Sequence, residues 1–251
     1  MGYFFGILYI SFMPSIFYRE HQHEYQTYKF GYCIYCKRIN SEPLIDIYSQ
    51  GFLPYSGYEN ICTDNDQVFY MARSVRVNRL YYTSTSENRR VAKMFKCNDF
   101  IITEKPAYEY INDEVMIQFC LQYFSNRHGE RIMNRERLIT ILSFSPEVFI
   151  TSYIHNNQQC AYVIEIKTRS MSHYWFSCFR LDTDYKSLGM WLMLYHTTQS
   201  FLNSENHFYY IGTLYGTSAL YKTNLLGIEY WNGVTWSNDV TTLKELARND
   251  E

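Results

Sequence analysis

Three basic residues stand close together near the start of a predicted helix, where they could bind phosphate groups. Arg89, Arg90 and Lys93 follow Ser84 and Glu87, whose spacing of three is that of the capping box that begins many helices. Basic side chains at a helix N-terminus oppose the helix dipole, so their position needs another reason. A phosphate-rich partner is such a reason, because Lys and Arg neutralise phosphate charge. A solvated charged face with salt bridges is the other interpretation.

Cys33 and Cys36 have the Cys-x-x-Cys spacing found in zinc and iron–sulfur sites. They lie in the run YKFGYCIYC, whose β-prone residues predict a strand. Residues three apart on a strand point to opposite faces, which disfavours chelation by this pair. We therefore expect no metal site and interpret both cysteines as packed strand residues.

The composition predicts a folded protein in a reducing compartment. Of the 251 residues, 47% are hydrophobic and 19% are charged, which favours a packed core over disorder. The seven cysteines are an odd number without a regular framework, so we expect reduced thiols and a cytoplasmic protein. The formal net charge of -2 argues against a protein that coats DNA or RNA through bulk charge, although it leaves room for a local basic patch.

Residues 1–18 form an apolar leader that is interrupted by Pro14. The leader lacks the basic region and the small-residue cleavage site of a signal peptide. It is also short for a membrane span, and the proline weakens it further. We therefore do not expect membrane attachment.

The elements that must position the candidate residues alternate between helices and strands. Apolar spacing predicts a helix that begins at Ser187 and presents Leu188, Trp191, Leu192 and Tyr195 on one face. The dipeptide Asn232-Gly233 predicts a two-residue hairpin turn. Further predicted helices cover residues 43–49 and 112–128, and predicted strands cover residues 68–77, 148–155, 159–167, 172–179 and 207–215.

The run of residues 187–239 resembles the C-terminal domain of the arginyl/leucyl-tRNA–protein transferases. Its pattern is S-L-G, then L-M, a Y-Y-I-G strand, Y-K, and a G-I-E-Y segment followed by tryptophan. A second resemblance covers residues 72–95, where an R-V strand precedes a serine-rich, basic helix start. In that family the C-terminal domain has an acetyltransferase-like (GNAT-like) fold. The resemblance implies an α+β protein with a GNAT-like mixed sheet flanked by helices in residues 96–251, after a smaller α/β N-terminal part in residues 1–95.

Members of this family move an aminoacyl group from a charged tRNA to the N-terminal amine of a protein. The resemblance implies that activity here, with arginine favoured over leucine, aminoacyl-tRNA and a protein or peptide N-terminus as partners, and no cofactor. The aminoacyl ester is already activated, so the enzyme has to hold it beside the amine, help the amine lose a proton and stabilise the oxyanion. The residues that the resemblance assigns to catalysis are Asp182, Asp184, Tyr215 and Tyr221, and those assigned to tRNA binding are Arg89, Arg90, Lys93 and Lys222.

The sequence departs from the family pattern at two places. An Asp-Pro pair often stands seven residues before the serine of S-L-G, where this chain has Arg180. The second cysteine pair of many arginyltransferases is absent from residues 67–73. These departures leave two other interpretations open: an acyl-CoA-dependent GNAT-like enzyme, and a catalytically silent relative that binds peptide or RNA. The single glycine of residues 184–189 disfavours the first, because acetyl-CoA enzymes usually present a glycine-rich loop there.

Overall fold

The computed structural model describes residues 15–24, 29–39, 42–57, 67–203 and 205–250 of the chain. Most of the apolar leader, residues 1–14, lies outside the described residues, so the interpretation of the leader stays a prediction. Within the described part, no helix is both long enough and apolar enough to cross a membrane.

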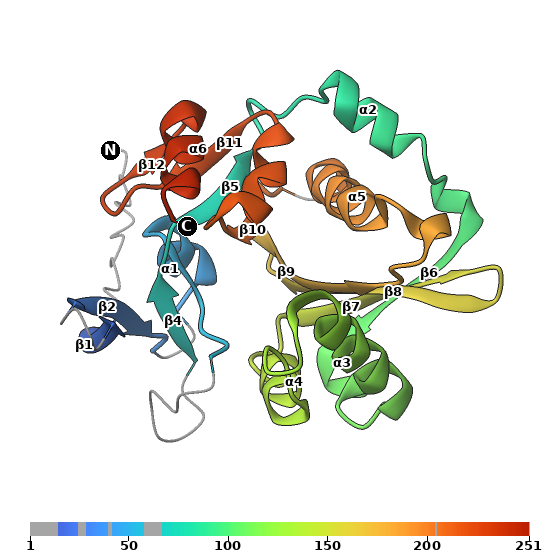
Figure 1. Ribbon diagram of the computed structural model, residues 1–251, viewed down its shortest axis with the longest axis horizontal. Coiled ribbons are helices and arrows are strands. Elements are labelled where there is room, and N and C mark those ends of the chain that lie inside the picture. The colour runs from blue at the N-terminus through green and yellow to red at the C-terminus, as the bar shows by residue number, and fades with distance from the viewer. Residues whose placement is uncertain (1–14, 25–28, 40–41, 58–66, 204, 251) are drawn as a thin grey trace, which may run out of the picture.

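A large mixed sheet forms the body of the described chain (Figure 1). Its strand order is β12–β11–β5–β10–β9–β8–β7–β6, and neighbouring strands are antiparallel except for the parallel pair β9 and β10. The strands are β5 (Ser74–Asn78), β6 (Phe100–Pro106), β7 (Val148–His155), β8 (Gln158–Lys167), β9 (Met171–Phe179), β10 (Phe208–Thr213), β11 (Ile228–Trp231) and β12 (Trp236–Ser237).

Helices cover both faces of this sheet, α3 and α4 on one face and α5 and α2 on the other (Figure 1). Each face has its own apolar core, because successive residues of a strand point to opposite sides. Ile164 of β8 packs in the core that contains Cys120 and Leu138, whereas Val163 packs in the core that contains Leu188 and Leu192. The helices are α2 (Ser86–Ala92), α3 (Glu114–His128), α4 (Arg135–Leu142), α5 (Leu188–Asn203) and α6 (Val240–Arg248), with the 3-10 segments η1 (Cys97–Asp99), η2 (Ala107–Tyr110), η3 (Thr183–Tyr185) and η4 (Thr217–Asn224).

The predicted fold class is confirmed: the chain is α+β, with a mixed sheet flanked by helices. The antiparallel strands β7, β8 and β9 lead into α5, which returns the chain to β10 parallel to β9. This arrangement is the acetyltransferase-like middle that the resemblance implies. The predicted helix over residues 112–128 is also confirmed, and the Asp113 side chain caps it by accepting a hydrogen bond from the Met116 amide at 3.0 Å.

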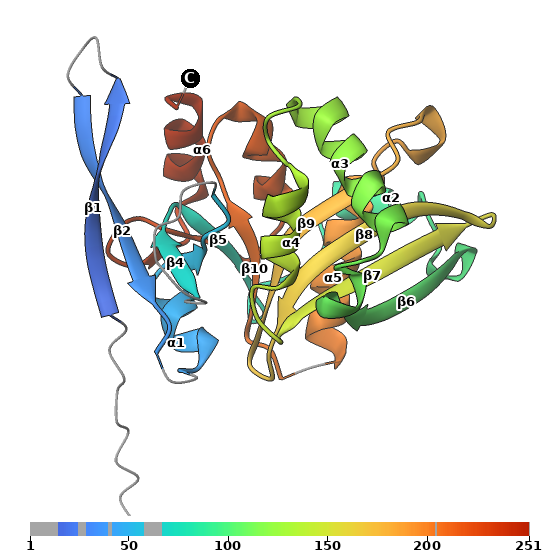
Figure 2. The same cartoon turned by 90° about the horizontal axis from the view of Figure 1, so that it is seen from below.

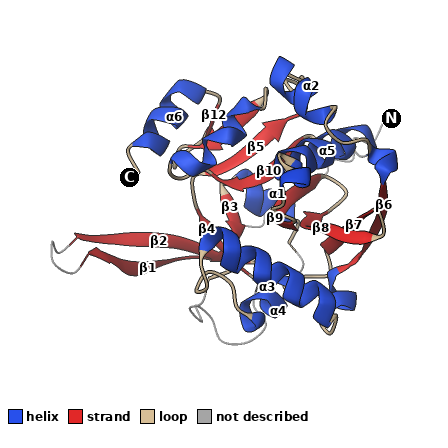
Figure 3. Cartoon of the chain, turned by 45° about the vertical axis from the view of Figure 1, so that its right-hand side comes forward, coloured by secondary structure: helices blue, strands red, loops and turns tan. Residues whose placement is uncertain are grey.

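A smaller sheet, β1–β2–β4–β3, lies beside the large one. Its outer ribbon of β1 and β2 extends away from the body (Figure 2 and Figure 3). Cys33 and Cys36 lie on β2 as predicted, and burial raises the pKa of the Cys36 thiol to about 12. The elements are β1 (Ser15–Glu24), β2 (Lys29–Lys37), α1 (Leu44–Ser49), β3 (Phe52–Pro54) and β4 (Val68–Met71).

The prediction of one strand over residues 68–77 is wrong. The segment forms two strands in different sheets: Tyr70 of β4 pairs with Tyr35, whereas Arg76 of β5 pairs with Tyr210 and Glu229. Ala72 and Arg73 make the crossing between the sheets, and an apolar pattern alone does not reveal such a change of partner. The expected division at residue 95 stays a prediction, although β5, which precedes it, lies within the large sheet.

The capping box of α2 is displaced by one residue from the predicted Ser84 and Glu87. Thr85 Oγ1 accepts from the Asn88 amide at 3.0 Å, and the Asn88 side chain accepts from the Thr85 amide at 3.1 Å. This start turns Val91 into the core and leaves Glu87 at the surface. The predicted turn at Asn232 is also longer, because Trp231 pairs with Trp236 and leaves residues 232–235 in the loop.

Gly51, which follows α1, makes a close contact that only glycine permits. Its φ is +82°, and a Cβ atom at this position would lie 2.3 Å from Cγ of Trp231. We expect Gly51→Ala to lower the free energy of unfolding by about 1–3 kcal/mol, through the left-handed backbone and the clash with the ring. Gly233→Ala is the matched control, since Gly233 has a φ of +101° but nothing within 4 Å. Equal losses for the two variants in thermal unfolding would contradict the role of Trp231.

Candidate functional site

The parallel strands β9 and β10 pair over only a short stretch. Residues Phe208 to Tyr210 pair with Met171 to His173, while β9 itself continues to Phe179. Gly212 follows on β10 with a φ of +80°, and a Cβ there would lie 3.5 Å from Lys222 Nζ. The Lys222 ammonium therefore fills the space beside β10 where the pairing with β9 has ended. We call His173, Gly212, Thr213 and Lys222 the β9–β10 junction.

Lys222 is half-buried and donates a hydrogen bond from Nζ to the Thr213 carbonyl at 2.7 Å. Among the described residues, no carboxylate forms an ion pair with it. Removal from water disfavours the charged form of an amine, and it lowers the pKa of the Lys222 ammonium to about 8. The neutral amine of Lys222, which can accept a proton, is therefore more accessible near physiological pH than that of an ordinary lysine.

His173 contributes a second buried polar group to the junction. Its Nδ1 lies 3.0 Å from the Tyr48 hydroxyl of α1, so the N-terminal part of the chain holds the ring in place. Burial, reinforced by the charge of Lys222, lowers the pKa of His173 to about 3, and the imidazole is neutral. Its Nε2 is buried without a hydrogen-bond partner in the described part of the protein. Such atoms are rare in native structures and often have a functional explanation.

Tyr215 and Tyr221 differ in their surroundings. Tyr221 precedes Lys222 on η4 and is 46% exposed, and burial of the rest of the residue raises the pKa of its hydroxyl. Tyr215 is equally exposed, but its hydroxyl accepts a hydrogen bond from the Arg73 amide at 2.8 Å, and the Arg73 guanidinium lies 4.8 Å from its ring centre. Tyr215 therefore ties the crossing between the two sheets to the end of β10.

Asp182 and Asp184 lie on the exposed segment that joins β9 to α5. Asp182 accepts a hydrogen bond from Arg180 Nε at 2.6 Å. Within the described residues, neither aspartate forms a hydrogen bond or an ion pair with Lys222. In the first turn of α5, Gly189 packs against a ring: a Cβ at this position would lie 2.4 Å from Phe179 Cζ. The glycine of S-L-G thus has a packing role that does not require a bound phosphate.

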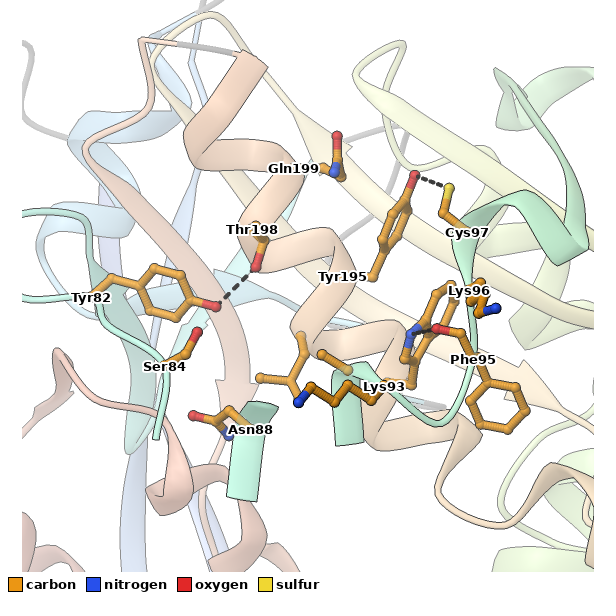
Figure 4. A pocket seen from close by; sticks show the side chains of 13 residues that line it. Tyr82, Ser84, Asn88, Lys93, Phe95, Lys96, Cys97, Tyr195, Thr198 and Gln199 are labelled. Carbon is orange, nitrogen blue, oxygen red and sulfur yellow. Dashed lines mark hydrogen bonds between the residues drawn. The ribbon is translucent and has the colours of Figure 1, made fainter. Parts of the chain in front are cut away.

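Lys93, the C-cap of α2, lines a pocket between α2 and α5 (Figure 4). Arg89 and Arg90 lie in the last turn of α2 and not at its start as predicted, so their charges agree with the helix dipole and the predicted conflict is absent. The pocket has a volume of about 520 Å³, and Lys93 is part of its lining. Arg89 and Arg90 are exposed beside it, Arg90 in an ion pair with Glu87 at 2.7 Å and Arg89 donating to the Ser84 carbonyl at 2.5 Å. Lys222 lies against β10, and no hydrogen bond within the described chain joins it to α2.

Aromatic rings and a second lysine complete this α2–α5 pocket. Trp191 and Tyr195 of α5 are stacked, with ring centres 5.0 Å apart and planes at 9°. Lys96, which the sequence did not single out, joins Lys93 in the lining. The full lining is Tyr82, Ser84, Asn88, Ala92, Lys93, Phe95, Lys96, Cys97, Trp191, Leu194, Tyr195, Thr198 and Gln199.

A buried polar network under α5 was not predicted. Glu165 accepts hydrogen bonds from His196 Nδ1 at 2.8 Å and from the Tyr209 hydroxyl at 2.6 Å, and its carboxylate pairs with Lys167 at 2.9 Å. The Tyr153 hydroxyl lies 2.6 Å from His196 Nε2. Burial alone would raise the pKa of Glu165, but His196 and Lys167 hold it at about 2. The carboxylate is 2% exposed, so the network stabilises the fold and does not reach a substrate.

Comparisons with known proteins give only distant likenesses. No family model matches the chain, and no curated protein matches it by sequence. Among solved structures, FemX has a TM-score of 0.43 and 8% identity, over 68% of this chain and 59% of that chain. The C-terminal domain of a proposed lysylphosphatidylglycerol synthetase from Agrobacterium fabrum has a TM-score of 0.37 and 9% identity, over 72% and 55%. An aminoglycoside acetyltransferase from an uncultured soil metagenomic sample, in complex with sisomicin, has a TM-score of 0.33 and 11% identity, over 51% and 84%. All three TM-scores are below 0.5, so these structures do not indicate the function of this chain.

Proposed function

We propose that the chain is an aminoacyl-tRNA–protein transferase that moves an amino acid, arginine in preference to leucine, from charged tRNA to the N-terminal amine of an acceptor protein. The observation that carries this proposal is Lys222, an ammonium without a carboxylate partner in the described chain and with its pKa lowered to about 8. An α-amine has a pKa near 7.7–8.0, so a proton passes between the two amines at little cost. The resemblance in residues 72–95 and 187–239 supplies the substrate class.

In the proposed reaction the neutral Lys222 Nζ takes a proton from the acceptor ammonium. The free amine then attacks the ester carbonyl of the aminoacyl-tRNA, so a C–N bond forms and the C–O bond to the ribose breaks. The ribose oxygen leaves with the proton that Lys222 returns to it, and the second proton that the nitrogen loses as the amide forms passes to the neutral Lys222 and on to water. The junction is half-buried, and electrostatic interactions are stronger there than in bulk water. Tyr221 is proposed to bind the ester end beside Lys222.

In this proposal Lys222, which was predicted to bind tRNA, acts as the base, and the remaining predicted residues have supporting roles. Asp182 and Asp184 are proposed to position the acceptor amine from the segment before α5, and Tyr215 to hold the end of β10 in place. Arg89, Arg90 and Lys93 are proposed to contact tRNA phosphates. Their clustering on one short helix gives the local basic patch that a chain of net charge -2 needs for this purpose.

A transfer assay with labelled amino acids tests the proposal. Purified protein is offered Arg-tRNA or Leu-tRNA together with peptides that differ in their N-terminal residue. We expect labelling of a peptide by one tRNA, strongest with Arg-tRNA. Replacing Arg89 and Arg90 by Ala is expected to weaken tRNA binding and to reduce its salt dependence by about one ion per lost contact. Arg169→Ala/Arg248→Ala removes the same charge from other exposed positions and serves as the control. Folded protein that labels no peptide with either tRNA would overturn the proposal.

A further inference from the structure

The C-terminal helix α6 ends beside the segment that leads from β10 into η4. Its buried residues Leu243 and Ala247 belong to the same apolar core as Leu214, the residue that follows β10. The helix packs against η4, and Asp250 comes directly after its C-cap, Asn249. Packing of the apolar face of α6 therefore brings the Asp250 carboxylate to the start of η4.

The Asp250 carboxylate joins two backbone segments at this point. Its Oδ2 accepts a hydrogen bond from the Gly216 amide at 2.9 Å and pairs with Arg73 Nη1 at 2.7 Å, while Oδ1 lies 3.2 Å from Arg73 Nη2. Such a two-point arginine–carboxylate pair fixes geometry as well as charge. The Arg73 and Asp250 side chains are 17% and 23% exposed, so the pair is largely removed from water, and the hydrogen bond from Arg73 lowers the pKa of Asp250.

Gly216 is the N-cap residue of η4 and has no side chain that could cap this segment. The amides at the start of a helical segment need acceptors from outside it, and Asp250 supplies one to Gly216. Gly216 has a φ of +66°, and a Cβ at this position would have nothing within 4 Å. Because packing around this position is open, the hydrogen bond to Asp250 is a main restraint on the start of η4. Lys222 lies in the last turn of the same segment.

We propose that Asp250 is a positioning residue, which holds the start of η4 through Gly216 and so keeps the Lys222 amine against the end of β10. The Lys222 ammonium donates to the Thr213 carbonyl at 2.7 Å, so its anchor and the Asp250 anchor lie on the same short stretch, residues 213–216. The importance of this placement for catalysis rests on the proposed function. The effect of Asp250 on the surroundings of Lys222 does not.

Loss of the Asp250 carboxylate has two effects of opposite sign on the Lys222 ammonium. Removal of a negative charge disfavours an ammonium group, so the change of charge alone would lower the pKa of Lys222 further. Release of η4 would return Lys222 to water, which raises its pKa from about 8 toward the ordinary value of 10.5. The direction of the change therefore separates positioning from a long-range effect of charge.

The experiment measures the pKa of Lys222 in the whole protein by trace acetylation with acetic anhydride over a series of pH values, read by peptide mass spectrometry. Exposed Lys105 is the internal reference. The variants are Asp250→Ala, Asp250→Asn, which keeps an acceptor oxygen for the Gly216 amide, and Glu245→Ala, which removes an exposed carboxylate from the same helix. Melting curves establish that each variant is folded.

We expect Asp250→Ala to raise the pKa of Lys222 and to leave that of Lys105 unchanged, while Asp250→Asn and Glu245→Ala keep Lys222 near its wild-type value. An unchanged or lowered pKa of Lys222 in Asp250→Ala overturns the proposal, as does an equal rise in either of the other variants. Peptide labelling is a separate readout. If the pKa rises as expected but the wild type labels no peptide, the proposed function alone is refuted; labelling by the wild type with no rise in Asp250→Ala refutes the positioning role alone.

Discussion

Replacement of Lys222 by Met is expected to lower the rate of peptide labelling by about 10²–10⁴-fold, the range that a general base contributes. Methionine is unbranched and fits a half-buried site, so the loss reflects the missing amine more than altered packing. Lys222 donates one recorded hydrogen bond, to the Thr213 carbonyl, and the folded state should tolerate its removal. Single-turnover labelling with preformed aminoacyl-tRNA measures the chemical step directly.

The matched variant is Lys222→Arg, which keeps the positive charge but cannot lose a proton at physiological pH. We expect it to be nearly as inactive as Lys222→Met. The wild-type rate should fall as the pH drops below about 8, because Lys222 becomes protonated there. In both variants, any increase of the labelling rate with pH that remains is due to deprotonation of the acceptor amine alone. Full activity in the arginine variant would show that Lys222 acts through its charge and not as a base.

Glu165→Ala is expected to lower the free energy of unfolding by about 3–5 kcal/mol, the usual cost of removing one partner from a buried ion pair. The substitution would leave His196 and Lys167 without their common carboxylate and Tyr209 without its acceptor. Chemical denaturation monitored by tryptophan fluorescence measures the loss. Glu205→Ala is the control, since Glu205 is 78% exposed and pairs with Arg169 only at 3.6 Å. The free energy of unfolding of this variant should hardly differ from that of the wild type.

The same carboxylate makes stability depend on pH in the acid range. The pKa of Glu165 is lowered in the folded protein from 4.5 to about 2, so its contribution is complete above pH 4.5 and is lost as the pH falls toward 2. Wild-type protein should therefore lose stability more steeply than Glu165→Ala in this window. Parallel curves for the two proteins would exclude Glu165 as the titrating group.

Local features of the fold could be predicted from the sequence because they depend on neighbouring residues. Asp113 caps the N-terminus of α3. Asn156 and Asn157 form the turn between β7 and β8, and both asparagines have a positive φ. The buried face of α5 followed from the spacing of Leu188, Trp191 and Leu192. Each of these signals lies within one turn of helix or one hairpin.

Features that depend on partners far along the chain could not be predicted. Glu165 reads as one residue of an alternating strand, and only the folded chain brings His196 of α5 to it. From the sequence, Lys222 is indistinguishable from a surface cation. In the folded chain η4 places it against β10, where burial lowers the pKa of its ammonium. Lys96 lies beyond the predicted basic cluster, and the end of α2 at Ala92 is what brings it into the pocket.

The position of β5 makes the large sheet depend on a strand that is encoded in the N-terminal part of the gene. In the sheet, β5 lies between β10 and β11. In the sequence, it precedes α2 and is separated from β10 by more than a hundred residues. A gene fragment that begins after residue 95 would encode a sheet that lacks the interior strand β5. The N-terminal part therefore cannot be exchanged as a module unless its replacement supplies a strand for the gap between β10 and β11.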